Sequence, residues 1–170
     1  LKGKSLVFTG VMDYEPNEDA MVYFIQEVFD KVAKKCPEVT LYIVGKNPTD
    51  KLKKLVINRK NIIVTGKVDS VFSYIKSSTI YISPLRIGSG KKNKIIEAIS
   101  CGTPLIASTV SMEGFEDIED KNLILRADSS NEWVENICKL LSDEEKRIDI
   151  KKRMFNLLDE SYSWKNIAKK

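Results

Sequence analysis

The sequence contains no histidine among its 170 residues, and this absence excludes several common kinds of active site. A Ser-His-Asp relay, a histidine general base and histidine metal ligation are impossible within the chain. Cysteine is scarce as well, because Cys36, Cys101 and Cys138 are an odd number without disulfide or zinc-site spacing. They lie in predicted helices or at a helix end, so we expect buried thiols.

Long apolar runs are also missing. No run approaches the ~18 to 20 residues that a membrane span needs, and no early segment resembles a signal peptide. The 28 Lys and Arg against 24 Asp and Glu give a net charge of +4. This charge suits an anionic small ligand or an acidic membrane face, but it is too mild and too dispersed to indicate nucleic-acid binding. We expect a cytoplasmic protein whose full-length form can associate with the inner face of the membrane.

The chain does contain enough apolar material for one core, since 42% of its 170 residues are hydrophobic. It has no internal repeat and no linker-like stretch, so residues 1–170 are predicted to form a single domain. The chain starts at Leu1, without an initiator Met, where a strand is approaching. We expect it to be a fragment of a longer protein.

Short β-branched runs alternate with helical periods along the chain. The runs are apolar with little alternation, which is typical of strands covered on both faces. Strand and helix in alternation predict βαβ crossovers, and hence an α/β fold: a three-layer α/β/α Rossmann-like domain with a parallel sheet of about six strands. The expected strands are residues 5–9, 40–44, 61–65, 79–83, 104–107 and 123–125, and the expected helices are 17–35, 50–56, 70–76, 91–101, 131–141 and 143–158.

The carboxyl ends of the strands are where ligands bind in such sheets. Loops with polar or flexible residues leave the strands at 10–17, 45–49, 66–70 and 84–91. We therefore expect a binding site assembled from these loops.

Residues 84–98, PLRIGSGKKNKIIEA, bring glycines, cations and one carboxylate together where a strand gives way to a helix. Glycines let the backbone approach phosphate oxygens, and the first N–H groups of a helix point at an anion. Lysines add charge, and Glu97 can accept paired hydrogen bonds from vicinal hydroxyls such as those of a ribose. The pattern predicts a nucleotide diphosphate site, although Gly88 and Gly90 could also form only a tight turn.

Other residues near this loop have structural interpretations too. Lys94 and Glu97 are three apart on one helix and could form a surface ion pair, but both side chains lean back toward the loop, which favours ligand contacts. Arg86 could contact phosphate or bond loop carbonyls. Asp69, with Val68, could reach a nucleobase, or it could cap the helix that follows.

Five motifs follow one another along nearly the whole chain: Thr9-Gly10 with Pro16-Asn17, residues 41–45, residues 64–68, residues 84–94 and residues 97–104. In this order they resemble the carboxy-terminal, donor-binding half of a GT-B-fold glycosyltransferase of family 4. Glu-Ala followed by Cys-Gly-Thr-Pro and a β-branched strand is a strong mark of this family, whereas a lone Gly-x-Gly pair is common by chance.

The resemblance implies transfer of a sugar from a UDP- or GDP-linked donor to a glycan or lipid-linked acceptor, with retention at the anomeric carbon. The acceptor would bind an amino-terminal domain that is absent from residues 1–170. No cofactor is implied, and no metal is indicated because no Asp-x-Asp pair lies near the loop. The implied roles are catalytic for Ser89, Lys94 and Glu97, diphosphate-binding for Gly10, Arg86, Gly88, Ser89, Gly90 and Lys94, ribose-binding for Glu97, and nucleobase-proximal for Val68 and Asp69.

The chain departs from the family pattern in two places. The first glutamate of the family's Glu-x7-Glu element, which meets the donor sugar, falls at Ser89, which offers a hydroxyl and no carboxylate. The family's basic pair in the loop after the first strand is replaced by Val11 and Pro16-Asn17. Lys94 and Arg86 are therefore the candidate cations for the diphosphate.

Other functions compete with this one. A non-catalytic nucleotide-sugar-binding module would explain the serine at position 89. A GT-B-fold epimerase or phosphorylase relative is disfavoured because histidine and a cofactor-lysine motif are missing. A dinucleotide-binding dehydrogenase needs a glycine fingerprint after the first strand, and a phosphate-receiver module needs clustered aspartates at the strand ends; neither pattern is found.

Overall fold

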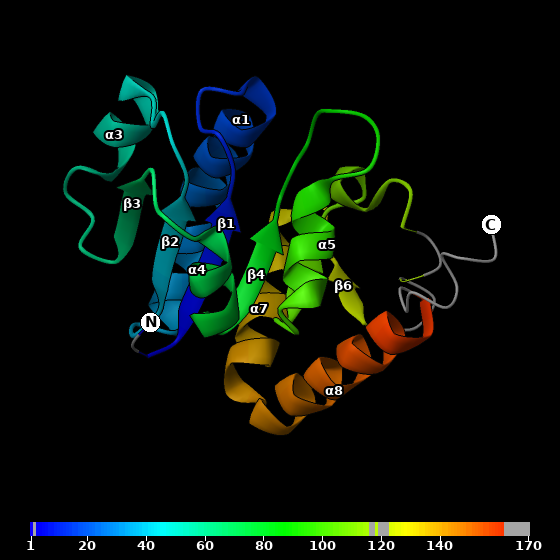
Figure 1. Ribbon diagram of the computed structural model, residues 1–170. Coiled ribbons are helices and arrows are strands. Elements are labelled where there is room, and N and C mark those ends of the chain that lie inside the picture. The colour runs from blue at the N-terminus through cyan, green and yellow to red at the C-terminus, as the bar shows by residue number, and fades with distance from the viewer. Residues whose placement is uncertain (2, 116–117, 119–122, 162–170) are drawn as a thin grey trace.

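The computed structural model describes residues 1, 3–115, 118 and 123–161. Its centre is a six-stranded parallel sheet with the strand order β3-β2-β1-β4-β5-β6 (Figure 1). Because β1 pairs with both β2 and β4, the winding of the chain reverses between β1 and β4, which is the position where open α/β sheets bind ligands. The strands are β1 (Ser5–Thr9), β2 (Thr40–Val44), β3 (Ile62–Gly66), β4 (Ile80–Ser83), β5 (Leu105–Ala107) and β6 (Ile124–Arg126).

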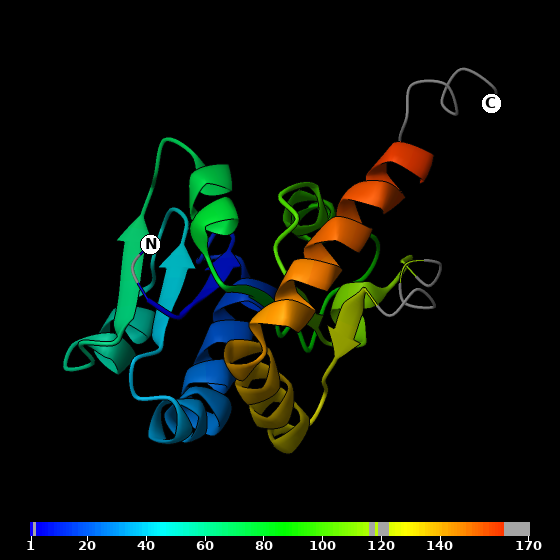
Figure 2. The same ribbon diagram turned by 90° about the horizontal axis from the view of Figure 1, so that it is seen from below.

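Helices cover both faces of this sheet, so the predicted three-layer Rossmann-like architecture is confirmed. In Figure 1, α4 and α5 lie in front of the sheet and α1 and α7 lie behind it. Helix α8 crosses the end of the molecule opposite the loop between β4 and α5, and Figure 2 shows it from that side. The helices are α1 (Glu15–Tyr23), α2 (Asp30–Lys35), α3 (Asp50–Val56), α4 (Val71–Ser77), α5 (Asn93–Ser100), α7 (Ser130–Ser142) and α8 (Glu144–Ser161), with a π-helical stretch η1 (Phe24–Phe29) and a 3-10 turn η2 (Val110–Met112).

The core lies on both sides of the central strands. Strands β1 and β4 are buried along their whole length, as expected for parallel strands between two helical layers. Behind the sheet, Phe24 of η1 meets Trp133 of α7 edge-to-face, with ring centroids 5.7 Å apart and planes at 88°. This contact packs η1 against α7 behind the sheet.

The first long helix differs from the prediction of one α-helix over residues 17–35. It starts two residues earlier, at Glu15, and Pro16 lies in its first turn, where the missing N–H costs no helical hydrogen bond. Between α1 and α2 the chain forms η1, a π-helical stretch with a wider turn. Four of its side chains, Phe24, Ile25, Val28 and Phe29, are buried, so the wide turn serves the apolar contact with α7.

Helix starts follow their capping residues. We expected that Asp69 could cap α4, but Ser70 does so, because its hydroxyl accepts the N–H of Ser73. Helix α5 begins at Asn93 and not at residue 91, because Lys92 has an extended backbone. The three cysteines are free and pack against the core, but they are partly exposed, whereas we expected buried thiols.

Candidate functional site

A cavity of about 420 Å³ opens at the carboxyl ends of β1, β2 and β3, beside the start of α5. The loops after these strands form its floor, and α5 forms one wall. It therefore lies next to the reversal of winding between β1 and β4, as the topology predicts. The lining residues are Thr9, Gly10, Val11, Val44, Gly45, Lys46, Lys67, Val68, Val71, Asn93, Lys94 and Glu97.

Two glycines allow the floor loops to approach each other. A Cβ atom on Gly45 would lie 1.7 Å from the carbonyl oxygen of Gly10, and the φ angle of Gly45, +146°, favours glycine as well. A Cβ atom on Gly10 would lie 2.6 Å from Nδ2 of Asn17. Gly10 thus makes room for the Asn17 side chain, which is buried.

Asn17 holds the cation of the site. Its Oδ1 accepts a hydrogen bond of 2.7 Å from Nζ of Lys94, while its Nδ2 donates one of 2.9 Å to the carbonyl of Val11. Nζ of Lys94 also lies 4.2 Å from the centre of the Phe8 ring. These contacts fix the amine at the cavity wall.

Burial lowers the pKa of Lys94 from 10.5 to about 7. The nearby carboxylate of Glu97 opposes this change and raises the pKa, whereas the charge of Lys92 lowers it further. Asn17 offers a neutral acceptor and no negative charge. An anionic ligand in the cavity would supply that charge and favour the ammonium form.

Glu97 lines the same cavity. The alternative of a surface ion pair is not realised, since within residues 3–115 the Lys94 amine bonds Asn17 and no ion pair joins it to Glu97. Val68 and Val71 add apolar side chains to the lining on the β3 side. The cavity therefore combines an apolar wall, a carboxylate acceptor and a cation.

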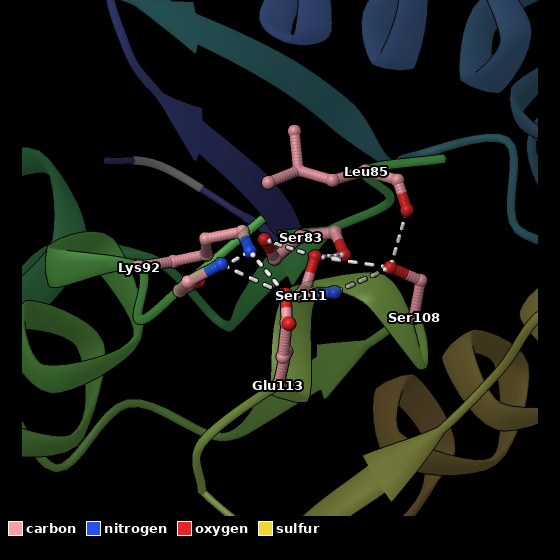
Figure 3. A network of polar contacts seen from close by, with 7 residues as sticks. Ser83, Leu85, Lys92, Ser108, Ser111 and Glu113 are labelled. Carbon is pink, nitrogen blue, oxygen red and sulfur yellow. Dashed lines mark hydrogen bonds and ion pairs between the residues drawn. The ribbon is translucent and has the colours of Figure 1, made fainter. Parts of the chain in front are cut away.

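The glycine loop after β4 lies outside this cavity. Gly88 and Gly90 have positive φ angles of 113° and 74°. The Gly90 N–H donates a 2.8 Å hydrogen bond to Oε2 of Glu113, and Nζ of Lys92 lies 3.4 Å from the same oxygen (Figure 3). Ser89 is exposed between the two glycines. The Gly90 N–H, which we predicted would donate to a diphosphate, thus already donates to a carboxylate of the protein.

Arg86 is engaged by other residues as well. Its Nε donates a 2.9 Å hydrogen bond to Asp19, and its guanidinium lies 4.7 Å from the centre of the Tyr23 ring. The Asp19 carboxylate raises the pKa of Arg86. This partner is a carboxylate on α1, whereas we had considered phosphate or loop carbonyls.

Comparison with known proteins identifies the family. A family model described as "Glycosyl transferases group 1" matches residues 3–143. The chain belongs to this family. An uncharacterized glycosyltransferase of Methanocaldococcus jannaschii is 32% identical to this chain over 140 residues, which cover 78% of the chain and 35% of the relative. The chain thus spans about a third of the length of that relative.

Solved structures show the same fold. The crystal structure of a TarM mutant of S. aureus in complex with Fondaparinux, alpha-GlcNAc-glycerol and UDP superposes with a TM-score of 0.82 at 18% identity, covering 98% of this chain and 34% of that chain. The C-terminal domain of LpcC, a glycosyl transferase group 1 family protein from Francisella tularensis, superposes with a TM-score of 0.73 at 20% identity, covering 96% and 87% of the two chains. The group 1 domain therefore has the fold of the C-terminal half of a GT-B glycosyltransferase, as predicted.

The structure brings together part of the predicted site. Gly10, Val68, Lys94 and Glu97 line one cavity. Arg86, Asp69 and the residues of the glycine bend, Gly88, Ser89 and Gly90, are not among its lining residues.

Sequence reasoning gave no site role to several lining residues, among them Lys46, Lys67 and Asn93. Each of these three has a positional signal, because Lys46 and Lys67 follow the glycines at the carboxyl ends of β2 and β3, Gly45 and Gly66, and Asn93 opens α5. Within the described parts of the chain, no group of three or more His, Cys, Asp or Glu could hold a metal ion. No helix among these residues is long and apolar enough to cross a membrane.

Proposed function

We propose that this chain is the nucleotide-sugar-binding half of a retaining glycosyltransferase, which transfers a sugar from a UDP- or GDP-linked donor to a glycan or lipid-linked acceptor. The observation that carries the proposal is one cavity lined by both Lys94 and Glu97 at the winding reversal of the sheet. The presence of UDP in the TarM complex, which shares the fold, supports a nucleotide donor.

The lining chemistry suggests how the donor lies. Val68 and Val71 offer apolar contact to a nucleobase, and the Glu97 carboxylate accepts hydrogen bonds from ribose hydroxyls. The diphosphate lies against Lys94 and the N–H groups of the first two residues of α5, since the third, that of Ile95, already donates to the carbonyl of Lys92. Lys46 and Lys67 add positive charge at the rim.

The proposed mechanism follows from where charge develops. As the bond between the sugar and the nucleotide breaks, negative charge grows on the leaving diphosphate, and fixed donors stabilise that charge more than the ground state. Lys94 is held in position by Asn17 before the donor arrives, so little reorganisation is needed. The acceptor would bind a separate amino-terminal domain that closes over the donor. We therefore expect the isolated chain to bind donor without turnover.

Calorimetry with UDP, GDP and ADP tests the donor site. One nucleotide should bind with clear preference, and Glu97→Gln should weaken it about tenfold by removing charged acceptors for the ribose. The 2′-deoxy form of the same nucleotide lacks one of the ribose hydroxyls that Glu97 would bind. Its affinity should therefore fall less on the same substitution. Glu135→Gln, at an exposed position on α7, is the matched control and should change nothing. Equal and negligible binding of all three nucleotides would contradict the proposal.

A non-catalytic nucleotide-sugar-binding module is the second candidate, favoured by the serine at position 89. The full-length protein should release nucleotide from a sugar nucleotide when glycan or lipid acceptors are present. Tight donor binding without release for any acceptor would support the binding module over the enzyme.

A further inference from the structure

A second cavity, of about 430 Å³, lies on the other side of the glycine loop. It is formed at the carboxyl ends of β4, β5 and β6, so it shares the edge of the sheet with the first cavity, which Lys94 and Glu97 line. Its lining residues are Gly88, Thr109, Val110, Met112, Glu113 and Arg126.

Gly88 brings the two cavities close together. It lines the second cavity, and a Cβ atom on it would lie 3.9 Å from the ring of Pro16. Pro16 directly precedes Asn17, which holds the Lys94 amine of the first cavity. The glycine loop therefore separates the two cavities. We infer that a ligand bound to Lys94 by one group can place a neighbouring group beside Gly88.

A network of buried serines fixes the segment that carries Glu113. The Ser111 hydroxyl donates a 2.6 Å hydrogen bond to the carbonyl of Ser83 at the end of β4, and Ser108 donates one of 2.5 Å to the carbonyl of Leu85 (Figure 3). The hydroxyls of Ser108 and Ser111 also lie 3.0 Å apart. Glu113 follows this turn directly, so the network sets its position relative to the glycine loop.

The Glu113 carboxylate has one engaged oxygen and one available oxygen. Oε2 accepts the Gly90 N–H and faces the Lys92 amine, but within the described residues no hydrogen bond or ion pair involves Oε1. The side chain is 53% exposed and lines the second cavity. The carboxylate is thus oriented by the loop and still able to accept a hydrogen bond.

We propose that the second cavity receives the glycosyl group of the donor and that Glu113 binds its hydroxyls through Oε1. This inference rests on the proposed function. The segment from Pro84 to Lys92 contains no acidic residue of its own, so Glu113 gives this loop the carboxylate that Ser89 does not provide. Carboxylates are strong acceptors for vicinal hydroxyls. Glu113 thereby contributes to the choice of sugar and not to the binding of the nucleotide.

Paired calorimetric titrations test this assignment with the chain as it stands. The probes are UDP with UDP-glucose and UDP-GlcNAc, and GDP with GDP-mannose. The wild type should bind one sugar nucleotide more tightly than the matching nucleotide. Glu113→Gln should remove that advantage by lowering the affinity for the sugar nucleotide up to about tenfold. The affinity for the nucleotide without its sugar should change by less than about twofold. Glu135→Gln should retain the advantage.

Each other outcome has a distinct meaning. If Glu113→Gln weakens nucleotide and sugar nucleotide equally, Glu113 only supports the loop, and the inference is wrong. Equal affinity of the wild type for every nucleotide and its sugar conjugates also overturns it, while leaving the nucleotide site intact. Absence of binding for all five probes would instead refute the proposed function, and this inference with it.

Discussion

Replacing Lys94 with Met is expected to abolish a proton uptake that accompanies nucleotide binding. The amine is half-buried, its acceptor Asn17 is neutral, and burial lowers its pKa to about 7. A diphosphate placed beside Nζ adds negative charge and favours the ammonium form, so it raises this pKa toward the ordinary value of 10.5. Binding above pH 7 must therefore draw a proton from solvent.

The size of the uptake follows from the pKa. At pH 8, a group with a pKa of 7 is protonated in only about a tenth of the molecules, so binding takes up about 0.9 proton per site. At pH 8 the terminal phosphate, which titrates near pH ~6, is already ionised and contributes little. Affinity should fall by up to about tenfold per pH unit above pH 7, until the pH reaches the pKa of the complex.

Calorimetry at pH 8 in two buffers of different ionisation enthalpy measures the uptake directly. Lys94→Met should reduce it to near zero and weaken diphosphate binding about tenfold to a hundredfold, with less effect on the nucleoside. Lys67→Met removes a cation from the exposed rim of the same cavity and should retain the uptake. No uptake in the wild type, or an unchanged uptake in Lys94→Met, would refute the assignment of Lys94 to the diphosphate.

Three further substitutions test the framework of the site. Gly45→Ala places a Cβ 1.7 Å from a neighbouring carbonyl oxygen and should lower the free energy of unfolding by about 3 kcal/mol or more, whereas Gly66→Ala, with nothing within 4 Å, should cost about 1 kcal/mol. Similar costs in urea titrations would contradict this reasoning. Trp133→Ala should cost about 3 to 5 kcal/mol, measured in the same way, since the side chain is 1% exposed. Arg86→Gln should change nucleotide affinity less than about twofold, because Asp19 already holds the guanidinium outside the cavity; a loss as large as that of Lys94→Met would show phosphate contact.

The architecture could be predicted because it depends on local patterns. Apolar runs gave all six strands within a residue or two, and the spacing of apolar residues gave the helices. The π-helical stretch was not predictable, since it carries the same apolar pattern as an α-helix and is selected by packing against α7. The N-cap of α4 was not predictable either, because Asp69 and Ser70 are adjacent and both can cap a helix, and only the structure shows that Ser70 does so.

The site was predictable where one segment carries it and not where distant segments meet. Lys94 and Glu97 belong to one helix, so their spacing placed them together. The partners of Lys94 and Arg86, by contrast, are 77 and 67 residues away in the chain. The contact of Gly90 with Glu113 likewise spans 23 residues. No local pattern reports such pairs, and they decide which predicted residues face the cavity.

The arrangement of Gly10, Asn17 and Lys94 constrains how this sequence can change over generations. An arginine or lysine introduced at position 17 would sit within reach of the Lys94 amine and would lose the acceptor that holds it. It would also crowd the space that the missing side chain of Gly10 leaves open. The acceptor at position 17 and the amine at position 94 are therefore coupled, and we expect lineages that change one of these residues to change the other as well.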